Sequence, residues 1–409
     1  MRSVDEHLGK ILAAVPLLQT LDIALLEAAG AALAEPVTAP VPLPPFDNSA
    51  MDGYAVCASD VAAASEEAPV TLPVIGDVAA GDLTASAIRP GLSVRIMTGA
   101  PMPAGADAVI PVEWTDGGTV QVRISRSAPP GHYIRRAGDD VVAGQVVLEA
   151  GTRLAAAQLG MLAAVGLARV PVRPKPRVVV LSTGTELREP GSQIAPGQIW
   201  DSNSFMLTAA VAEAGGVGYR QPSVADEPEK VLETIEDQLA RADAIVTSGG
   251  VSMGAKDVVK EVFAAHGAGL SGIGTVEFCK VAMRPGAPQG FGLIGDKTPI
   301  FTLPGNPVSA YVSFQVFVRP ALRAMQGLPP EPLPTVTAEL THDVTSPRDL
   351  RHFLRAELTL SGGSYVVTPA HGQGSHQLAA LAAASGLIIM PENVDALPAG
   401  SHVDVLRLP

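Results

Sequence analysis

The sequence predicts a multidomain protein that combines a parallel-sheet α/β domain with β-rich domains. Two proline-rich segments, residues 35–45 and 326–334, divide the 409 residues into parts, because proline disfavours helices and favours extended connectors. Strand and helix patterns alternate over residues 176–327, which is typical of a parallel sheet covered by helices. Short strand patterns bounded by glycine, proline or aspartate dominate the insertion before this stretch and the chain after it.

The composition supports several hydrophobic cores and disfavours some partners. Apolar residues make up 47% of the chain and charged residues 17%, and the length exceeds what one core usually serves. A net charge of -13 disfavours nucleic-acid binding, although a few cations in one cleft could hold a small anion. Cys57 and Cys279 lack zinc-site spacing, and we find neither a secretory signal nor an apolar stretch of roughly 20 residues. We therefore expect a cytoplasmic protein without nucleic-acid or membrane partners.

Four domains are predicted along the chain. Apolar residues at helical spacing indicate two helices over residues 7–34 and another over residues 151–168. We expect the later helix to pack on the first two, so that 1–45 and 146–175 form an N-terminal helical and linker domain. Residues 46–145 then form a β-rich insertion domain. The α/β domain spans residues 176–327, and residues 328–409 form a small C-terminal β-barrel.

Three strand-to-helix turns of the α/β domain carry residues suited to anion binding, namely residues 181–186 (LSTGTE), 247–254 (TSGGVSMG) and 303–309 (LPGNPVS). Glycine lets the backbone approach a ligand and present its N–H groups. All three turns follow predicted parallel strands, and open α/β sheets bind ligands at that edge. We expect Asn306 to cap the following helix, with Pro307 in its first turn. One such turn alone is usually structural, but three in one domain favour a binding site.

Charged residues near these turns have a functional and a structural interpretation. Lys280 and Arg284 could contact an anion, or could end a strand. Asp226 and Asp257 could cap helices, or could hold Mg²⁺, which prefers oxygen ligands. In the insertion, residues 134–140 (IRRAGDD) place two guanidinium groups beside two carboxylates, an arrangement that surface ion pairs also produce.

Taken together, these segments resemble the molybdopterin molybdotransferase family, which includes bacterial molybdenum insertases and the E domains of the plant insertase and gephyrin. The resemblance extends from about residue 5 to 405. The first and seventh of its motifs are highly specific. The motifs are residues 46–55 (FDNSAMDGYA), 97–101 (MTGAP), 135–140 (RRAGDD), 182–187 (STGTEL), 201–203 (DSN), 248–252 (SGGVS), 304–309 (PGNPVS) and 372–376 (GQGSH).

The resemblance implies a homodimer whose pocket lies between the molybdopterin-binding-like α/β domain of one subunit and the insertion of the other. The implied reaction inserts molybdate into molybdopterin-AMP and releases AMP with the help of Mg²⁺. Tungstate, a tetrahedral dianion of similar size, fits the same pattern. Further implied partners are a molybdopterin adenylyltransferase and the molybdoenzymes that accept the product.

The resemblance also assigns residues to three roles. The implied catalytic residues come from the insertion and the α/β domain, and are Asp52, Thr98, Asp140, Glu186, Lys280 and Arg284. The implied ligand-binding residues are Ser182, Thr183, Gly184, Ser248, Gly249, Gly250, Ser252, Pro304, Gly305, Asn306, Pro307 and Ser375. Asp226 and Asp257 would hold Mg²⁺.

The sequence departs from the family pattern at three positions. Ala255 stands where an acidic residue is usual, Ala287 where a lysine is usual, and Arg284 where lysine is common. A planar guanidinium differs in geometry from an ammonium, so these changes bear on oxyanion affinity.

Two other functions fit parts of the pattern. An adenylyltransferase that activates molybdopterin with ATP shares the Ser-Gly-Gly turn, but the insertion and the C-terminal β domain disfavour it. A scaffold that binds receptor peptides, as gephyrin-type domains do, is disfavoured by the carboxylates and the glycine-containing turns.

Overall fold

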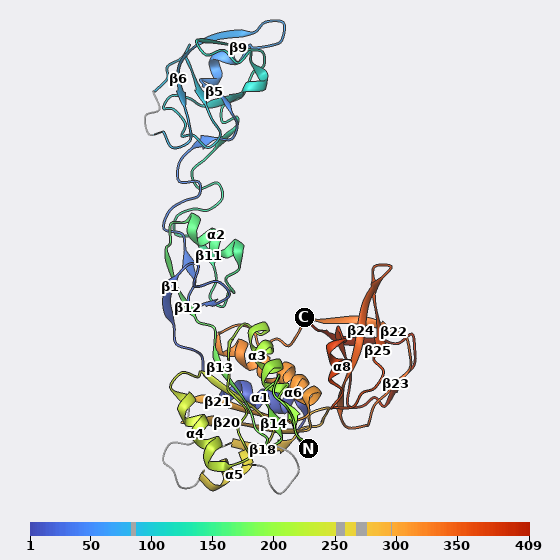
Figure 1. Cartoon of the computed structure of the whole chain (residues 1–409). Coiled ribbons are helices and arrows are strands. Elements are labelled where there is room, and N and C mark those ends of the chain that lie inside the picture. Colours follow the sequence, from blue (N-terminus) through green and yellow to red (C-terminus); the bar gives the residue numbers. More distant parts are fainter. Residues whose placement is uncertain (83–86, 251–257, 267–275, 296) are drawn as a thin grey trace.

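The structure, a computed structural model, describes residues 1–82, 87–250, 258–266, 276–295 and 297–409. Figure 1 shows an elongated molecule of four parts. The β-rich insertion forms one end, a small unit with helix α2 lies in the middle, and the α/β unit forms the other end with the C-terminal β unit beside it.

The α/β unit contains a mixed six-stranded sheet in the described residues, with the order β16-β13-β17-β21-β20-β18. Four neighbouring strands are parallel: β16 (Val217–Arg220), β13 (Arg177–Ser182), β17 (Ala244–Ser248) and β21 (Thr298–Leu303). The last two, β20 (Pro288–Ile294) and β18 (Val276–Lys280), are antiparallel. The predicted parallel sheet thus has an antiparallel edge, because the connections there are too short for the crossover that parallel strands need.

Helices cover both faces of this sheet. One face packs against α3 (Asn203–Glu213), α6 (Pro307–Ser313), the π-helical turn η3 (Phe314–Val318) and α7 (Arg319–Met325). The other face packs against α4 (Pro228–Leu239) and α5 (Val258–His266). Successive strand side chains point to opposite faces, so Val178 and Val180 join the first core while Val179 and Leu181 join the second. This double coverage explains why β13 is apolar at successive positions.

Helix α1 (Val4–Ala14) begins with a capping box, in which the Glu6 N–H donates to Ser3 Oγ at 3.1 Å and the Ser3 N–H to Glu6 Oε2 at 2.9 Å. Val4 and Ile11 pack in the same core as α7. The expected packing of the first helix on the helix of residues 151–168 is therefore wrong.

The middle unit contains a strand where a second helix was expected. Residues Leu21–Ala24 form strand β1, which pairs with β12 (Arg169–Arg173), and β12 also pairs with β2 (Ala32–Leu33). Helix α2 (Ala156–Ala164) packs in a core with residues of this sheet. The leucine spacing predicted a helix, but pairing with β12 satisfies the backbone N–H and C=O groups of Leu21–Ala24 in a strand instead.

The chain passes twice between the middle unit and the insertion (Figure 1). Where they leave the middle unit, these passages comprise residues 37–43 and 141–148, which we call the neck, and Ala39 and Val141 pack there against Val165 at the end of α2. Strand β3 (Val37–Thr38) pairs with β11 (Val146–Leu148). The Leu43 N–H donates to the Val141 carbonyl at 2.8 Å, so the passages are hydrogen-bonded along the neck.

The insertion contains a five-stranded sheet in the order β8-β5-β7-β6-β9, filled by two hydrophobic clusters. Its elements are β4 (Asn48–Ser49), β5 (Gly53–Val56), η1 (Ala58–Val61), β6 (Val70–Val78), β7 (Ser93–Ile96), β8 (Ala108–Pro111), η2 (Val112–Trp114), β9 (Gln121–Ile124) and β10 (Ile134–Arg135). The predicted β-rich character of this segment is confirmed.

The C-terminal unit is a closed barrel, because β24 pairs with both β25 and β26 while β22 and β28 complete the ring. Strand β19 (Met283–Arg284) of the α/β unit pairs with β24. The elements are β22 (Thr335–Leu340), β23 (Val344–Thr345), β24 (Arg351–Ser361), β25 (Ser364–Pro369), α8 (Leu378–Ala382), β26 (Gly386–Met390), β27 (Ala396–Leu397) and β28 (His402–Arg407). In the described parts of the chain, the helices are too short or too polar to cross a membrane.

Candidate functional site

A cavity of about 780 Å³ lies where β13, β17 and β21 end. Because these neighbouring strands are parallel, their carboxyl ends meet at one edge of the sheet, and the three predicted turns come together there. Twelve of the predicted site residues line the cavity: Ser182, Thr183, Gly184, Glu186, Asp226, Ser248, Gly249, Gly250, Pro304, Gly305, Asn306 and Pro307.

The second turn requires glycine for its shape. Gly249 and Gly250 have φ angles of +98° and +70°, which side chains rarely adopt. A Cβ atom on Gly249 would lie 2.6 Å from the Thr183 carbonyl oxygen, and one on Gly250 would lie 2.6 Å from Val259 Cγ2. The turn can therefore lie close against the first turn, with the Gly249 N–H donating to the Leu303 carbonyl at 3.1 Å.

Asp201 and Asn203 organise the cavity, although no site role was predicted for them. The buried Asp201 carboxylate accepts hydrogen bonds from Ser182 Oγ at 3.0 Å and from Ser204 N and Oγ at 3.1 and 2.6 Å. Asn203 Nδ2 donates to Ser248 Oγ and to the Gly305 carbonyl, both at 2.7 Å. An Asp-Ser-Asn sequence before a helix has the composition of a helix cap, which concealed this role.

The hydroxyl groups of the turns are not equally available to a ligand. Ser182 Oγ donates to Asp201, and Ser248 Oγ donates to the Pro304 carbonyl at 3.4 Å. Thr183 Oγ1 is buried and has no hydrogen-bond partner among the described residues. Since buried polar groups are rarely left unpaired, Thr183 is the hydroxyl best suited to donate to a bound molecule.

The C-terminal barrel supplies part of the cavity wall. Asn306 Nδ2 donates to Ser375 Oγ at 3.0 Å, and the Val308 N–H donates to the Ser375 carbonyl at 3.1 Å. Asn306 is the N-cap residue of α6 and Pro307 lies in its first turn, as expected, but the Asn306 side chain makes no capping hydrogen bond. Its amide is turned toward the barrel, and the Ser375 carbonyl accepts from the start of α6 instead. His376, the next residue, lines the cavity and was missed.

The carboxylates of the cavity offer oxygen ligands. Glu186 and Asp226 are exposed and line it together with buried Asp201. Asp226 Oδ2 accepts a hydrogen bond from the Thr185 N–H at 3.2 Å. Mg²⁺ is commonly held by one or two carboxylates together with substrate phosphates, so Glu186 and Asp226 fit this ion. The described residues contain no cluster of three potential metal-binding side chains. Ser252 and Asp257 lie outside the described residues.

Lys280 and Arg284 are exposed and are not among the described residues that line the cavity. Lys280 ends β18 opposite Pro288, which does line it. Arg284 lies opposite His352 of the barrel. The pKa of His352 is lowered to about 4, mainly because the ring is buried and to a smaller extent because the positive charge of Arg284 is near.

The insertion residues form a separate group. Asp52 Oδ1 accepts hydrogen bonds from the Thr98 N–H and Oγ1, both at 2.7 Å, and these bonds lower the pKa of Asp52. Asp140 is exposed. Figure 1 shows the insertion at the far end of the molecule from the α/β unit, with the middle unit between them. Within the described part of one chain, these three residues and the cavity are therefore apart.

Three family models match the chain in succession. Residues 2–166 match the "MoeA N-terminal region (domain I and II)", residues 179–324 the "Probable molybdopterin binding domain", and residues 337–408 the "MoeA C-terminal region (domain IV)". The fold and the cavity thus define an enzyme in which an α/β domain of the molybdopterin-binding type is joined to the two flanking MoeA regions.

Relatives extend this match over the whole chain. Molybdopterin molybdenumtransferase 2 of Mycobacterium tuberculosis is 47% identical over 411 residues, with both chains fully covered. The molybdopterin molybdenumtransferase of Bacillus subtilis is 36% identical and covers 92% of this chain and 87% of its own. A crystal structure of the Pyrococcus horikoshii molybdopterin biosynthesis MoeA protein superposes with a TM-score of 0.82 at 33% identity, covering 99% and 98% of the two chains. The chain belongs to the molybdopterin molybdenumtransferase family.

Proposed function

We propose that this enzyme inserts molybdate into molybdopterin-AMP and releases AMP, in molybdenum cofactor biosynthesis. The observation that carries the proposal is the cavity formed by three turns at the ends of β13, β17 and β21. At about 780 Å³ it has the size of a cofactor site. Tungstate, as a similar dianion, is a substrate candidate of the same class.

Different cavity residues would bind the phosphates, the Mg²⁺ ion and the ring system of the substrate. The Gly250 N–H and Thr183 Oγ1 would donate to phosphate oxygens, whereas the Gly249 N–H already donates to the Leu303 carbonyl at 3.1 Å. Glu186 and Asp226 would hold Mg²⁺, which neutralises the charge of the substrate phosphates. Trp200, which ends β15 (Ile199–Trp200) and is 49% exposed, presents an aromatic surface at the cavity to a heteroaromatic ring of the substrate.

The insertion supplies the group that places molybdate or the attacking water. Both polar hydrogens of Thr98 point to Asp52, so Thr98 orients Asp52 and keeps it ionised, as its lowered pKa indicates. Water attacks the phosphoanhydride of molybdopterin-AMP, the bridging P–O bond breaks, AMP leaves, and the protons of the water pass to the two phosphates. Molybdate exchanges one oxo group for the two dithiolene sulfurs, and that oxygen leaves as water with the two thiol protons. An ionised Asp52 is suited to orient the attacking water, and Asp140 of the same insertion would face the same pocket.

The enzyme acts as a homodimer in this proposal. The insertion, which carries Asp52, and the α/β unit, whose strand ends form the cavity, lie at opposite ends of one elongated chain (Figure 1), so in this proposal a second copy brings its insertion to the cavity. Closed two-fold dimers place two equivalent sites at such an interface.

The chain works in the cytoplasm, since Cys57 and Cys279 are both free thiols, as in a reducing compartment. It receives molybdopterin-AMP from an adenylyltransferase and passes its product to molybdoenzymes.

The test is release of AMP from molybdopterin-AMP in the presence of molybdate and Mg²⁺. We expect Asp226→Asn and Asp52→Asn each to lower kcat/KM by roughly 100-fold, because each removes a charge that holds the reacting groups. Asp77→Asn is the matched control, since Asp77 is an exposed carboxylate of the same insertion that makes a long 3.9 Å ion pair with Arg95. Its activity should stay within about twofold of the wild type.

Unchanged release in both Asp226→Asn and Asp52→Asn would refute the proposal. Formation of molybdopterin-AMP from ATP and molybdopterin by the wild type would instead support the adenylyltransferase alternative.

A further inference from the structure

We infer that the first residues of the chain form a clamp that positions Lys280 for the reaction. The N-terminal clamp consists of Arg2, His7, Glu277 and Cys279. It makes Arg2 a positioning residue, which acts through the strand that carries Lys280. The inference rests on the proposed function and adds to it Lys280, a residue to which the family resemblance gives a catalytic role.

The backbone of Arg2 pairs with the chain directly after β18. The Arg2 N–H donates to the Lys280 carbonyl at 3.0 Å, and the Ala282 N–H donates to the Arg2 carbonyl at 2.7 Å. β18 is the outermost strand of the sheet in the described part of the chain. These bonds therefore occupy backbone groups on both sides of Val281 that an unpaired strand edge would leave open to solvent.

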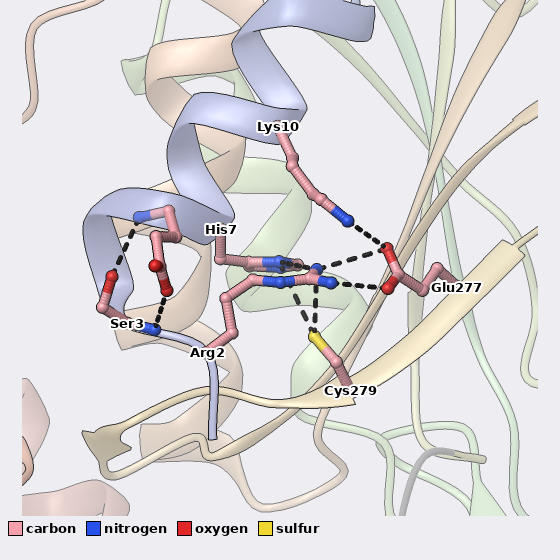
Figure 2. Close-up of polar contacts among 7 residues, drawn as sticks. Arg2, Ser3, His7, Lys10, Glu277 and Cys279 are labelled. Carbon is pink, nitrogen blue, oxygen red and sulfur yellow. Dashed lines mark hydrogen bonds and ion pairs between the residues drawn. The ribbon is translucent and has the colours of Figure 1, made fainter.

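The Arg2 side chain fastens the same strand from outside. Figure 2 shows its guanidinium group between the His7 ring, the Glu277 carboxylate and the Cys279 thiol. Arg2 Nη2 and Nη1 donate to Glu277 Oε1 and Oε2 at 2.5 and 3.2 Å, which is a bidentate pair. Arg2 Nη1 also contacts Cys279 Sγ at 3.6 Å. Glu277 and Cys279 are two residues apart, so they share one face of the strand.

Helix α1 anchors the clamp in the core. His7 is 2% exposed and packs edge-on against Phe317, with ring centroids 4.8 Å apart. Its Nδ1 lies 3.4 Å from Arg2 Nη1 and 3.7 Å from Cys279 Sγ. Arg2 is thus held between a buried helix and the strand, and not by an isolated surface ion pair.

The clamped segment leads directly to the cavity. Lys280 lies opposite Pro288, which lines the cavity, and the Val281 N–H donates to the Ala287 carbonyl at 2.7 Å. On the other side, the Arg351 N–H of the barrel donates to the Ala282 carbonyl at 2.9 Å. The segment is therefore held by β20, by the barrel and by Arg2, and loss of the Arg2 contacts loosens its outer edge so that Lys280 can shift.

The clamp should affect geometry more than global stability. Partly exposed ion pairs contribute little to stability, whereas a displacement of about 1 Å at a reacting group can cost on the order of 100-fold in rate. A positioning role therefore predicts that turnover falls while the melting temperature stays nearly constant.

The experiment compares four variants with the wild type: Arg2→Ala, Glu277→Gln, the charge-swapped double variant Arg2→Glu/Glu277→Arg, and Lys10→Ala. Lys10 is the matched control, because its ammonium pairs with the same Glu277 at 3.3 Å from an exposed position. Four quantities are measured: hydrogen exchange of a peptide containing Ala282, kcat for AMP release, KM for molybdopterin-AMP, and the melting temperature.

We expect Arg2→Ala and Glu277→Gln to speed exchange at Ala282 and to lower kcat by roughly tenfold each, with a small change in KM for molybdopterin-AMP. The charge-swapped double variant Arg2→Glu/Glu277→Arg should recover most of the lost kcat. The kcat of Lys10→Ala should stay within about twofold of the wild-type value.

Faster exchange with unchanged kcat and KM would overturn the positioning role and leave a structural contact. Unchanged exchange in Arg2→Ala would overturn the clamp itself. If the wild type releases no AMP, the proposed function fails and Lys280 has no reaction to serve, whereas the exchange result still decides whether the clamp exists.

Discussion

Individual histidines show how burial selects one protonation state. The pKa of His7 is lowered from 6.5 to about 4, mainly because the ring is buried and to a smaller extent because the positive charge of Arg2 is near. His7 is therefore neutral at pH 7 and can accept a hydrogen bond from Arg2 through Nδ1. In the unfolded chain its pKa returns to about 6.5, so between pH 6.5 and 4 the unfolded chain binds a proton that the folded chain does not.

Stability should therefore be fully present above pH 6.5 and should fall as the pH decreases toward 4. The His7 contribution amounts to roughly 3 kcal/mol over that window. His7→Gln should weaken this dependence, measured as the difference in unfolding free energy between pH 7 and pH 4.5 from urea titrations. His402→Gln, at an exposed position of β28, is the control and should follow the wild type. Equal slopes for His7→Gln and the wild type would contradict this assignment.

At the scale of elements, the turns were the most predictable part of the site and the strand edges the least. Glycines and hydroxyl residues directly after apolar strands identified all three turns, because that chemistry is local. The roles of Asp201 and Asn203 depend on contacts with turns far away in sequence, which local patterns do not contain. Residues Leu21–Ala24 formed a strand for the same reason, since β12 supplies the partner from about 150 positions later. The domain boundaries and residue roles stay predictions.

Two glycines of these turns should respond differently to a methyl group. Gly249→Ala places Cβ 2.6 Å from the Thr183 carbonyl oxygen at a φ of +98°, so we expect roughly 1 to 3 kcal/mol of destabilisation. Among the described residues, a Cβ in Gly305→Ala would meet only Gly249 Cα, at 3.6 Å, and the substitution should change stability by less than about 0.5 kcal/mol. Denaturant unfolding of both variants measures the difference. Equal stability of the two would show that the second turn can relax around a side chain.

For the whole molecule, the order of the four parts could be predicted from proline content and strand spacing, but their separation could not. Nothing in a linear pattern says how far apart residues 52 and 226 lie. The proposed homodimer follows from that separation and leads to a test by mixing two inactive proteins.

Asp52→Asn lacks the insertion carboxylate, and Asp226→Asn lacks a cavity carboxylate. After unfolding and refolding of an equal mixture, about half of the dimers should be mixed, and each should contain one site free of both substitutions. AMP release should therefore recover to about one quarter of the wild-type rate. Recovery absent from a mixture shown to contain mixed dimers would mean that both carboxylates act within one chain.

The neck sets how the far end of the molecule can move. A single-stranded linker would let the insertion rotate freely, but two passages that are hydrogen-bonded to each other resist torsion while still permitting bending. The insertion should therefore rotate less freely about the neck than it would on a single-stranded linker. That restraint narrows the range of orientations in which its acidic side chains can meet a partner's pocket.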